Sequence, residues 1–382
     1  MAYLKKYLIC ILLAIVGKAT AQWIPQSLLD IPSIVAADSN RLSLKVDMTG
    51  LFKNNEYFSP VAIGQTYPGM VLLPALTYQA SGKFRAEAGA YMVQFAGRDG
   101  FSLLQPFLRL QYAFTPKFSM VLGNLYGNLN HRLIEPLYQW EKHFTARPES
   151  GLQFVWHGDR LFADTWIDWE RYIERNDRFP EVLTFGASVV GRLFALDKRF
   201  FLNVPVQLLI HHQGGQIDQS DEPGMMLTNA AVGISTGYRL NRKWLQSVAI
   251  DIYDALYYDN STQHDARPYV QGQGIYSVLH LDAAPFALMV GYWHSEKFYA
   301  FHGEPLFASF DRYNPLDPLS QLPVRNMLIA KFAFDKTVYK GISIGAYAET
   351  YTDTDRGETD YSFGVHLRFC SAFTLCQLRI KP

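Results

Sequence analysis

The chain has 382 residues, with 35 basic and 35 acidic side chains, 15% aromatic residues and only 18% charged residues. This charge balance argues against a nucleic-acid-binding surface, which needs a basic patch, and the high apolar content excludes a disordered chain. The mean hydropathy of −0.05 excludes a bundle of membrane helices. Few charges with many aromatics suit a sheet in which lipid-facing and water-facing side chains alternate.

The N-terminus has the three parts of a secretory signal peptide. Lys5 and Lys6 supply positive charge, and the apolar run that follows ends at the small residues Ala19–Thr20–Ala21. We expect residues 1–21 to be cleaved, because the apolar run is too short to serve as a good membrane anchor. Residues 22–39 are expected to form a periplasmic leader that can enter the fold that follows.

Apolar and polar residues alternate with period 2 along most of the remaining chain. In one segment Leu42, Leu44 and Val46 alternate with Ser43 and Lys45, which is typical of a strand with one apolar and one polar face. Sixteen such strands are predicted, at 40–52, 70–80, 83–96, 102–114, 117–127, 150–157, 160–172, 181–194, 200–212, 225–239, 244–257, 268–281, 285–295, 324–335, 340–352 and 358–369. Most run ten to fourteen residues, which suits tilted strands that cross a membrane.

The connections between these strands alternate between short and long. Turns such as 80–83 and 115–117 are followed along the chain by long connections such as 128–149 and 296–323. Segregation of turns to one side and loops to the other is the pattern of transmembrane barrels, with turns in the periplasm and loops outside. The predicted fold is an all-β, antiparallel, up-and-down barrel of about sixteen strands over residues 40–369, with fourteen or eighteen as alternatives.

The last predicted strand has a specific signature. In Ser362–Phe369, the residues Gly364, Leu367 and Phe369 match the closing-strand signal of outer-membrane barrels: polar, any, Gly, any, any, hydrophobic, any, hydrophobic. The chain therefore resembles a bacterial outer-membrane β-barrel of porin size. The resemblance implies a location in the outer membrane among lipid and lipopolysaccharide, and recognition of this strand by the barrel-assembly machinery. It also makes a homo-oligomer possible.

Residues 370–382 continue beyond the signature as a C-terminal tail, whose segment from Phe373 can add a strand or fold into the lumen. This tail holds Cys370 and Cys376. In an exported protein they form a possible disulfide, and two free thiols are the equally weighted alternative. No array of Cys and His has metal-binding spacing, so we expect neither a metal nor a cofactor.

The polar faces of the strands predict the lining of the lumen. A charge on the lipid face costs about 2–4 kcal/mol at the membrane midplane, whereas a water-filled bore tolerates it. The bore is then either an open channel with a transverse field or a closed interior whose charges pair. The predicted lining residues are Arg85, Glu87, Arg109, Asp164, Trp166, Asp168, Glu170, Arg192, Arg239, Asp251, Lys331, Glu349 and Arg368.

Residues 128–149 form the third external loop, which in the resembling porins folds inward and narrows the pore. Glu135, Trp140 and Glu141 are the candidates for a constriction, and the two carboxylates would then face inward basic residues. The alternative is a surface loop. Trp166 beside Asp168 and Glu170 would suit stacking and hydrogen bonding to a sugar ring, although Trp and Tyr near strand ends also suit the interfacial girdle.

No catalytic constellation is visible along single strands. Ser362 and His366 share a face but lie about 13 Å apart at 3.3 Å per residue, too far for a nucleophile and its base. The predicted function is therefore a non-enzymatic channel for small hydrophilic solutes, with saccharides as candidates. The alternatives are a non-conducting scaffold of an export, assembly or surface complex, and a hydrolase whose residues meet across strands.

Overall fold

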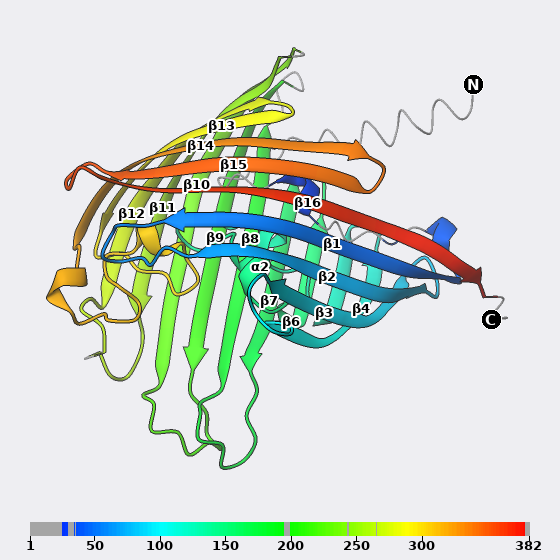
Figure 1. The fold of residues 1–382 in the computed structure, drawn as a ribbon, viewed down its shortest axis with the longest axis horizontal. Helices are drawn as coiled ribbons and strands as arrows, with labels where there is room; N and C mark the ends of the chain where they lie inside the picture. Colours follow the sequence, from blue (N-terminus) through cyan, green and yellow to red (C-terminus); the bar gives the residue numbers. More distant parts are fainter. Residues whose placement is uncertain are drawn as a thin grey trace.

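The computed structural model describes residues 25–29, 34, 36–194, 199–242, 244–264 and 266–378. The predicted signal peptide lies outside these residues. Within them, sixteen antiparallel strands close a barrel in which each strand pairs with its neighbours in sequence and β1 pairs with β16 (Figure 1). The predicted fold class and strand number are confirmed.

The strands join long loops at one end of the barrel and short turns at the other, where β1 begins and β16 ends (Figure 1). Every predicted strand boundary falls within four residues of the observed one, except the end of the last strand. The strands are β1 (Arg41–Glu56), β2 (Thr66–Gln79), β3 (Phe84–Phe95), β4 (Leu103–Thr115), β5 (Phe118–Asn124), β6 (Ser150–His157), β7 (Leu161–Arg171), β8 (Val182–Phe194), β9 (Phe200–Gln213), β10 (Met225–Arg242), β11 (Leu245–Asp259), β12 (Gln271–Ala283), β13 (Phe286–Glu296), β14 (Val324–Tyr339), β15 (Ile342–Asp353) and β16 (Glu358–Gln377).

The last strand is longer than predicted and corrects two expectations about the tail. Residues 370–377 continue β16 and pair with the start of β1, with a bulge between Leu42 and Ser43, so they form neither a separate strand nor a lumenal segment. Cys370 and Cys376 both lie on β16, six positions apart. At about 3.3 Å per residue their Cα atoms are about 20 Å apart, and a disulfide requires less than about 7 Å. No disulfide joins them.

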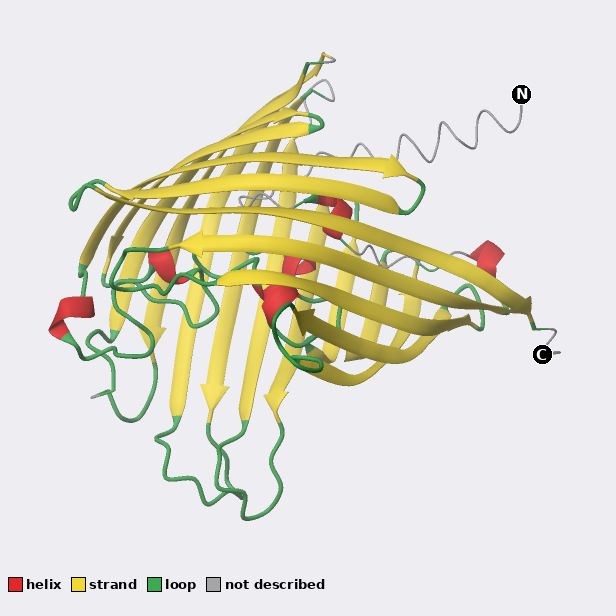
Figure 2. Ribbon diagram, in the orientation of Figure 1, coloured by secondary structure: helices red, strands yellow, loops and turns green. Residues whose placement is uncertain are grey.

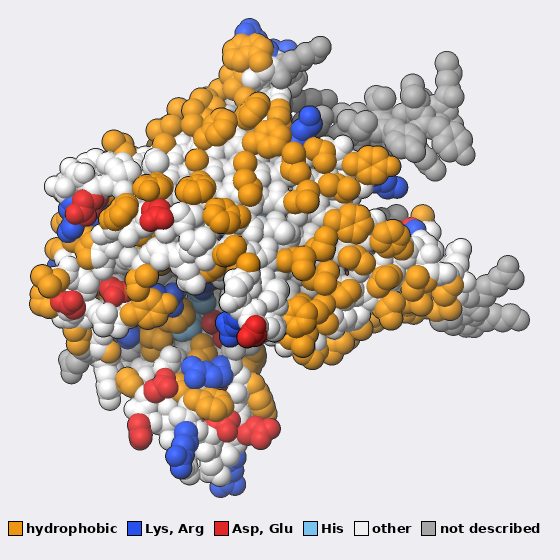
Figure 3. Space-filling model, in the orientation of Figure 1, with side chains coloured by type: hydrophobic (Ala, Val, Ile, Leu, Met, Phe, Trp, Pro, Cys, Tyr) orange, Lys and Arg blue, Asp and Glu red, His pale blue; other side chains and the backbone are white. Residues whose placement is uncertain are grey.

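The outer surface of the barrel is apolar. On β4 the side chains of Leu104, Leu108 and Leu110 are exposed, whereas those of Phe107 and Arg109 between them point inward and are buried. Figure 3 shows hydrophobic side chains over the strand wall, with charged side chains gathered mainly over the loops. This is the surface that a membrane-spanning barrel needs, and the chain is an outer-membrane barrel as predicted. Among the described residues, no helix is long and apolar enough to cross a membrane.

Long loops fill the interior of the barrel. The β5–β6 loop (residues 125–149) carries η3 (Asn128–His131) and α2 (Lys142–Thr145), and the β13–β14 loop (residues 297–323) carries η5 (Pro305–Phe307) and η6 (Pro318–Ser320) (Figure 2). Ile134 and Leu137 of the first loop and Phe298 and Phe307 of the second are fully buried in one apolar cluster with wall residues such as Trp293. The middle of the bore is therefore packed like a protein core.

Part of the leader also lies inside the barrel. Its 3₁₀ turn η1 (Gln26–Leu28) contacts the inner face of β14 and β16. Ser27 Oγ donates to Asp335 Oδ1 at 2.5 Å and lies 3.2 Å from His366 Nε2. Arg368 donates to the carbonyl oxygen of Ser27. The leader thus contacts the interior from the turn side of the barrel.

Candidate functional site

The charged residues predicted to line the lumen occupy inward strand positions, and several of them bond to one another. Arg109 Nη1 lies 3.0 Å from Glu87 Oε2, and Arg368 Nη2 lies 2.5 Å from Asp47 Oδ2. Lys331 Nζ lies 3.2 Å from Glu349 Oε1. The first and third pairs are buried, and the Asp47 side chain of the second is 15% exposed. The charges of the interior are therefore largely neutralised in pairs, which is the closed-barrel alternative raised by the sequence.

The remaining predicted lining residues serve separate local contacts. Asp168 accepts from Arg147 at 2.9 Å, and Asp251 lies 3.2 Å from His280. Arg192 donates to backbone carbonyls of the turn at residues 158–159. Further contacts are the pairing of Arg85 with Gln111, the stacking of Arg239 on Phe201, and the contacts of Asp164, Trp166 and Glu170 described below.

The β5–β6 loop folds inward, and its two predicted carboxylates meet inward lysines. Glu135 Oε1 lies 2.5 Å from Lys331 Nζ, and Glu141 Oε2 lies 2.9 Å from Lys53 Nζ. Trp140 is buried beneath them, only 2% exposed. A side-chain amide on β9 also holds the loop, because Gln207 accepts from the Ile134 amide at 2.9 Å and donates to the Arg132 carbonyl at 3.0 Å.

The two inward loops also hold each other. The Gln139 amide donates to the His302 carbonyl at 2.8 Å, and the Glu304 amide donates to the Glu135 carbonyl at 3.1 Å. Burial, followed by the nearby Glu141 carboxylate, raises the pKa of Glu304 to about 8 and so favours the protonated form of this carboxyl. Together the two loops form a plug that fills the middle of the barrel interior.

A buried histidine fixes the base of the β5–β6 loop. His131 Nε2 lies 2.7 Å from Glu149 Oε2, its Nδ1 lies 2.8 Å from Asp164 Oδ2, and its ring stacks on Trp166 at 3.5 Å. Burial lowers the pKa of His131, but Glu149 and Asp164 outweigh burial and raise that pKa to about 10. Burial acts to raise the pKa of Glu149, and the His131 charge overcomes it and lowers that pKa to about 2. The imidazolium and its two carboxylates therefore tie the loop to β7.

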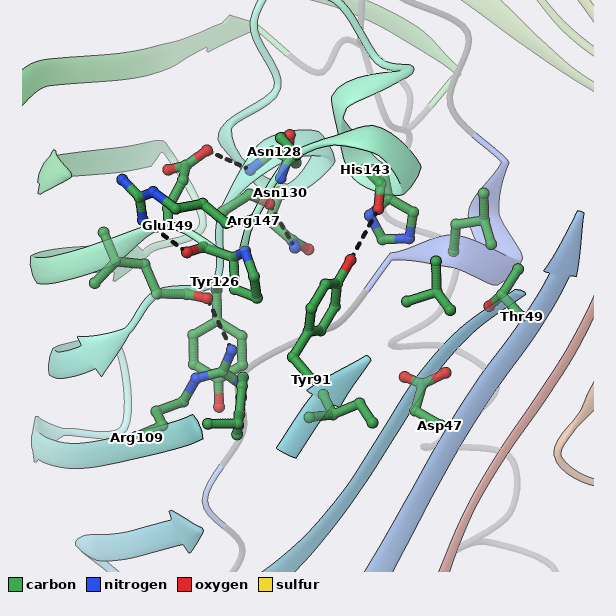
Figure 4. A pocket seen from close by; sticks show the side chains of 18 of the residues that line it. Asp47, Thr49, Tyr91, Arg109, Tyr126, Asn128, Asn130, His143, Arg147 and Glu149 are labelled. Atoms are coloured by element: carbon green, nitrogen blue, oxygen red, sulfur yellow. Dashed lines mark hydrogen bonds between the residues drawn. The ribbon is translucent and has the colours of Figure 1, made fainter. Parts of the chain in front are cut away.

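A small cavity lies between the β5–β6 loop and the leader. It has a volume of about 110 Å³, and its lining includes Asp47, Tyr91, Arg109 and Arg147 (Figure 4). The guanidinium of Arg109 stacks on the ring of Tyr126 at 3.8 Å from the ring centroid. Small-molecule sites typically measure about 300–1,000 Å³, so this cavity has room for water and not for a sugar.

A second polar cluster lies at the loop end of the wall, and we call it the rim cluster. It consists of Glu170 near the end of β7, Thr184 near the start of β8, His211 near the end of β9, and His302 from the β13–β14 loop. Thr184 Oγ1 lies 2.6 Å from Glu170 Oε1, 3.0 Å from His211 Nδ1 and 2.9 Å from His302 Nε2. Glu170 Oε1 lies 3.2 Å from His302 Nε2 and 3.5 Å from His211 Nδ1.

The surroundings of the rim cluster keep its groups in place. Thr184, His211 and His302 are buried, and the side chain of Glu170 is 23% exposed. The other nitrogen of His302 contacts the Lys142 ammonium. Burial, followed by the Lys142 charge, lowers the pKa of His302 to about 4, so its imidazole is neutral at pH 7. Because the Lys142 ammonium can only donate, His302 Nδ1 accepts and the ring hydrogen lies on Nε2, which faces the Glu170 carboxylate.

A larger cavity of about 690 Å³ opens among the outer loops. Its lining includes Tyr172, two positions after Glu170 of the rim cluster, and His212, one position after His211 of the same cluster. Apolar side chains such as Ile173, Ile217, Met225 and Met226 share this lining with polar ones such as Glu181, Gln213, Asn260 and Ser261. The cavity is large enough for part of an amphiphilic ligand.

Comparison with known proteins assigns the chain to a family. The model of the lipid A 3′-O-deacylase-type family matches residues 34–378, which include all sixteen strands of the barrel. The chain belongs to this family. In the lipid A 3′-O-deacylase-type chain described here, both the plug and the rim cluster lie within the matched residues. A search of curated proteins finds no match.

The fold of this lipid A 3′-O-deacylase-type chain is similar to that of solved outer-membrane proteins. OprD from Pseudomonas aeruginosa superposes with a TM-score of 0.50 at 7% identity, covering 92% of this chain and 98% of OprD. A loop-deletion mutant of OmpT from Vibrio cholerae gives a TM-score of 0.51 at 10% identity, covering 86% of this chain and 99% of that protein. At such identities the likeness concerns the porin-like fold alone.

Much of the rim cluster had no signal in the sequence. Glu170 was predicted to face inward, but Thr184, His211, His302 and Lys142 were not singled out as a group. Thr184 and His302 lie 118 positions apart, so no local spacing relates them. The signal in the sequence was that Glu170, Thr184 and His211 occupy inward-facing positions near the loop ends of three consecutive strands, β7, β8 and β9.

Proposed function

We propose that this barrel is an outer-membrane hydrolase that removes an ester-linked acyl chain from a glycolipid of the lipid A type. The observation that carries the proposal is the rim cluster, which gathers a carboxylate, two imidazoles and a hydroxyl at the outer end of the wall. The family description, lipid A 3′-O-deacylase-type, supports the same reaction. We also propose that the larger cavity among the outer loops, whose lining is partly apolar and partly polar, binds part of the glycolipid.

The geometry of the cluster suits general-base hydrolysis. Thr184 Oγ1 marks a point within hydrogen-bonding reach of Glu170 and both imidazoles, and a base must be within such reach of the proton it takes. In the proposed reaction the base removes a proton from water as the water oxygen adds to the acyl carbonyl carbon. The bond from that carbon to the sugar oxygen then breaks, and the proton passes to this oxygen. The products are a fatty acid and a sugar hydroxyl.

The plug favours a reaction at the rim of the barrel and argues against free diffusion of solutes through the bore. Its apolar core and the buried Glu135–Lys331 and Glu141–Lys53 pairs occupy the middle of the barrel. A sixteen-stranded wall without such a plug would leave an aqueous channel.

The test is the mass of lipid A after incubation with the purified, detergent-folded barrel. We expect wild-type protein to release one acyl chain, and we expect Glu170→Gln, which removes the general base, and His302→Gln, which removes its neighbouring imidazole, to lower the rate about 10²–10⁴-fold. His294→Gln is the matched control, since His294 bonds Asn326 at 2.8 Å on the outward side of β13. Folded wild-type protein that leaves several lipid A forms intact would contradict the proposal.

A channel for small hydrophilic solutes, including saccharides, is the second candidate. It is favoured by the porin-like strand number and by the charged inner cavity beside Asp47, Arg109 and Arg368. It requires the plug to move. Planar-bilayer conductance of wild-type protein and of a Glu135→Gln/Glu141→Gln variant tests it, with saccharides added as blockers. Solute-dependent conductance of the wild type supports a channel, and the absence of conductance in both proteins rules a channel out.

A further inference from the structure

The hairpin between β14 and β15 carries exposed basic side chains that neither the plug nor the rim cluster uses. Lys336 lies near the end of β14 and Lys340 lies in the turn that follows, and both are exposed. The exposed acidic side chains at the described turns are Asp159 on the β6–β7 hairpin and Asp282 on the β12–β13 hairpin. Asp282 accepts a hydrogen bond from Ser247 of β11, on the side of β12 away from β14. The β14–β15 hairpin therefore presents a concentrated positive charge at the turn end of the barrel.

Lys336 belongs to the lipid-facing side of β14. Leu328 and Phe332 precede it at intervals of four residues and are exposed, and side chains an even number of positions apart share one face of a strand. The adjacent Asp335 points the other way, because its carboxylate accepts from Ser27 of the leader inside the barrel. The Lys336 ammonium is therefore on the outer wall, where the strand leaves the membrane.

Aromatic rings lie beside Lys336 on the same outer wall. The ring of Phe286 on β13 contacts those of Phe332 and Phe334, with centroid separations of 5.8 Å and 5.4 Å. A register shift in β14 just before Tyr339 returns this residue to the outward side, where it is 72% exposed. Aromatic rings gather at the boundary between membrane and water, and lysines beside them extend their ammonium groups to the level of the lipid headgroups.

The hairpin also projects past its neighbour, which leaves a shelf beside the lysines. β14 pairs with β13 only as far as Phe334 but pairs with β15 as far as Tyr339 (Figure 1). The Asp335 amide still donates to the carbonyl of Pro285. Alternate amides of an antiparallel strand point to the same neighbour, so the Thr337 amide points to the side on which β13 has already ended. A phosphate bound by the lysines can therefore also accept from a backbone N–H.

We propose that the β14–β15 hairpin binds the headgroup of an anionic phospholipid in the periplasmic leaflet of the membrane. Lys336 and Lys340 contact the phosphate, while the exposed rings of Phe286 and Phe332 contact the acyl chains. The turns of such barrels lie in the periplasm, so this leaflet is the one that the hairpin meets. A lipid fits better than a soluble acidic partner, because the basic and apolar groups share the lipid-facing wall. The inference does not rest on the hydrolase proposal, whose residues lie at the loop end.

The test is native mass spectrometry of the folded barrel in dodecyl maltoside, with phosphatidylglycerol or phosphatidylcholine of the same acyl chains added. The two lipids then differ in the net charge of the headgroup. We expect wild-type protein to bind phosphatidylglycerol at least about tenfold more tightly than phosphatidylcholine. Each basic residue near an anionic lipid contributes about fivefold to affinity. The variant Lys336→Gln/Lys340→Gln should therefore lose at least about tenfold in affinity for phosphatidylglycerol and most of the preference for it.

The matched control is Lys83→Gln/Arg160→Gln, which removes two exposed basic side chains from the β2–β3 and β6–β7 hairpins and so changes the net charge equally. Its affinity for phosphatidylglycerol should stay within about twofold of wild type. Far-UV circular dichroism checks that each barrel is folded. Equal affinity of wild-type protein for the two lipids would overturn the proposal, and so would equal loss of phosphatidylglycerol binding in the two double variants.

Discussion

Lys331 of β14 and Glu135 of the β5–β6 loop are 196 positions apart in the chain, yet their Nζ and Oε1 atoms lie 2.5 Å apart in the closed interior of the barrel. Both side chains are buried, and Tyr351 adds a hydrogen bond to the same carboxylate oxygen at 2.7 Å. The pair fastens the plug to the wall. It therefore joins the strand wall of the barrel to the β5–β6 loop that fills its interior.

Breaking this pair should loosen the plug. Lys331→Met leaves the buried Glu135 without its cation and leaves Glu349 with Lys53 at 3.9 Å alone. Removal of one partner of a buried pair typically costs about 3–5 kcal/mol. We expect faster proteolytic cleavage of the β5–β6 loop and a lower unfolding temperature. The double variant Glu135→Gln/Lys331→Met should be less impaired than Lys331→Met.

The matched control is Lys117→Met on the turn side. Its partner Asp159 is 89% exposed, so this pair should contribute little to stability. Equal effects of Lys331→Met and Lys117→Met on loop cleavage would contradict the role of the buried pair.

The plug should respond to pH through His131. The pKa of this imidazole is raised from 6.5 to about 10. The stabilisation that His131 gives the folded state is therefore complete below about pH 6.5 and is lost as the pH rises to about 10. Glu149 acts in the acidic range, because its pKa is lowered from 4.5 to about 2. The stabilisation that Glu149 gives the folded state is complete above about pH 4.5 and is lost as the pH falls to about 2.

Hydrogen exchange of residues 125–149 measures this response. We expect protection to fall between pH 6.5 and pH 10 in wild-type protein after correction for the intrinsic exchange rate. His131→Gln should start with lower protection and lack most of this fall. The same pH dependence in both proteins would show that another group is responsible.

Gly186 provides the space that Trp166 needs. A Cβ at position 186 would lie 2.1 Å from Trp166 Cζ2, on the ring that stacks on His131. We expect Gly186→Ala to destabilise the barrel by about 1–3 kcal/mol, as overpacking does, measured by denaturant unfolding. Gly191→Ala on the same strand is the control, because its nearest contact would be 3.8 Å. Equal stability of the two variants would be inconsistent with this packing.

The two cysteines should behave as thiols. Intact-mass measurement of unreduced, denatured protein after alkylation should show two modified residues, since both lie on β16 six positions apart. A mass that shows no alkylation until a reductant is added would indicate a disulfide and contradict the observed course of β16.

The strands were readable from the sequence because each repeats a simple alternation, as in the exposed Leu104, Leu108 and Leu110 of β4. The inward loop was predicted from its position as the third external loop. Contacts of Glu135 and Glu141 with inward basic residues were expected to follow from that inward course. The end of β16 was missed because the closing signature stops at Phe369, whereas the strand continues to pair with the start of β1. The rim cluster was missed because Glu170, Thr184, His211 and His302 meet only once the barrel closes and the plug folds inward.

The most direct test of the account is the lipid A mass spectrum before and after incubation with wild-type protein and with Glu170→Gln. The account predicts loss of one ester-linked acyl chain with wild-type protein and little or no loss with the variant, which differs only in the rim cluster. Unchanged lipid A with folded wild-type protein, or equal deacylation by both proteins, would contradict it.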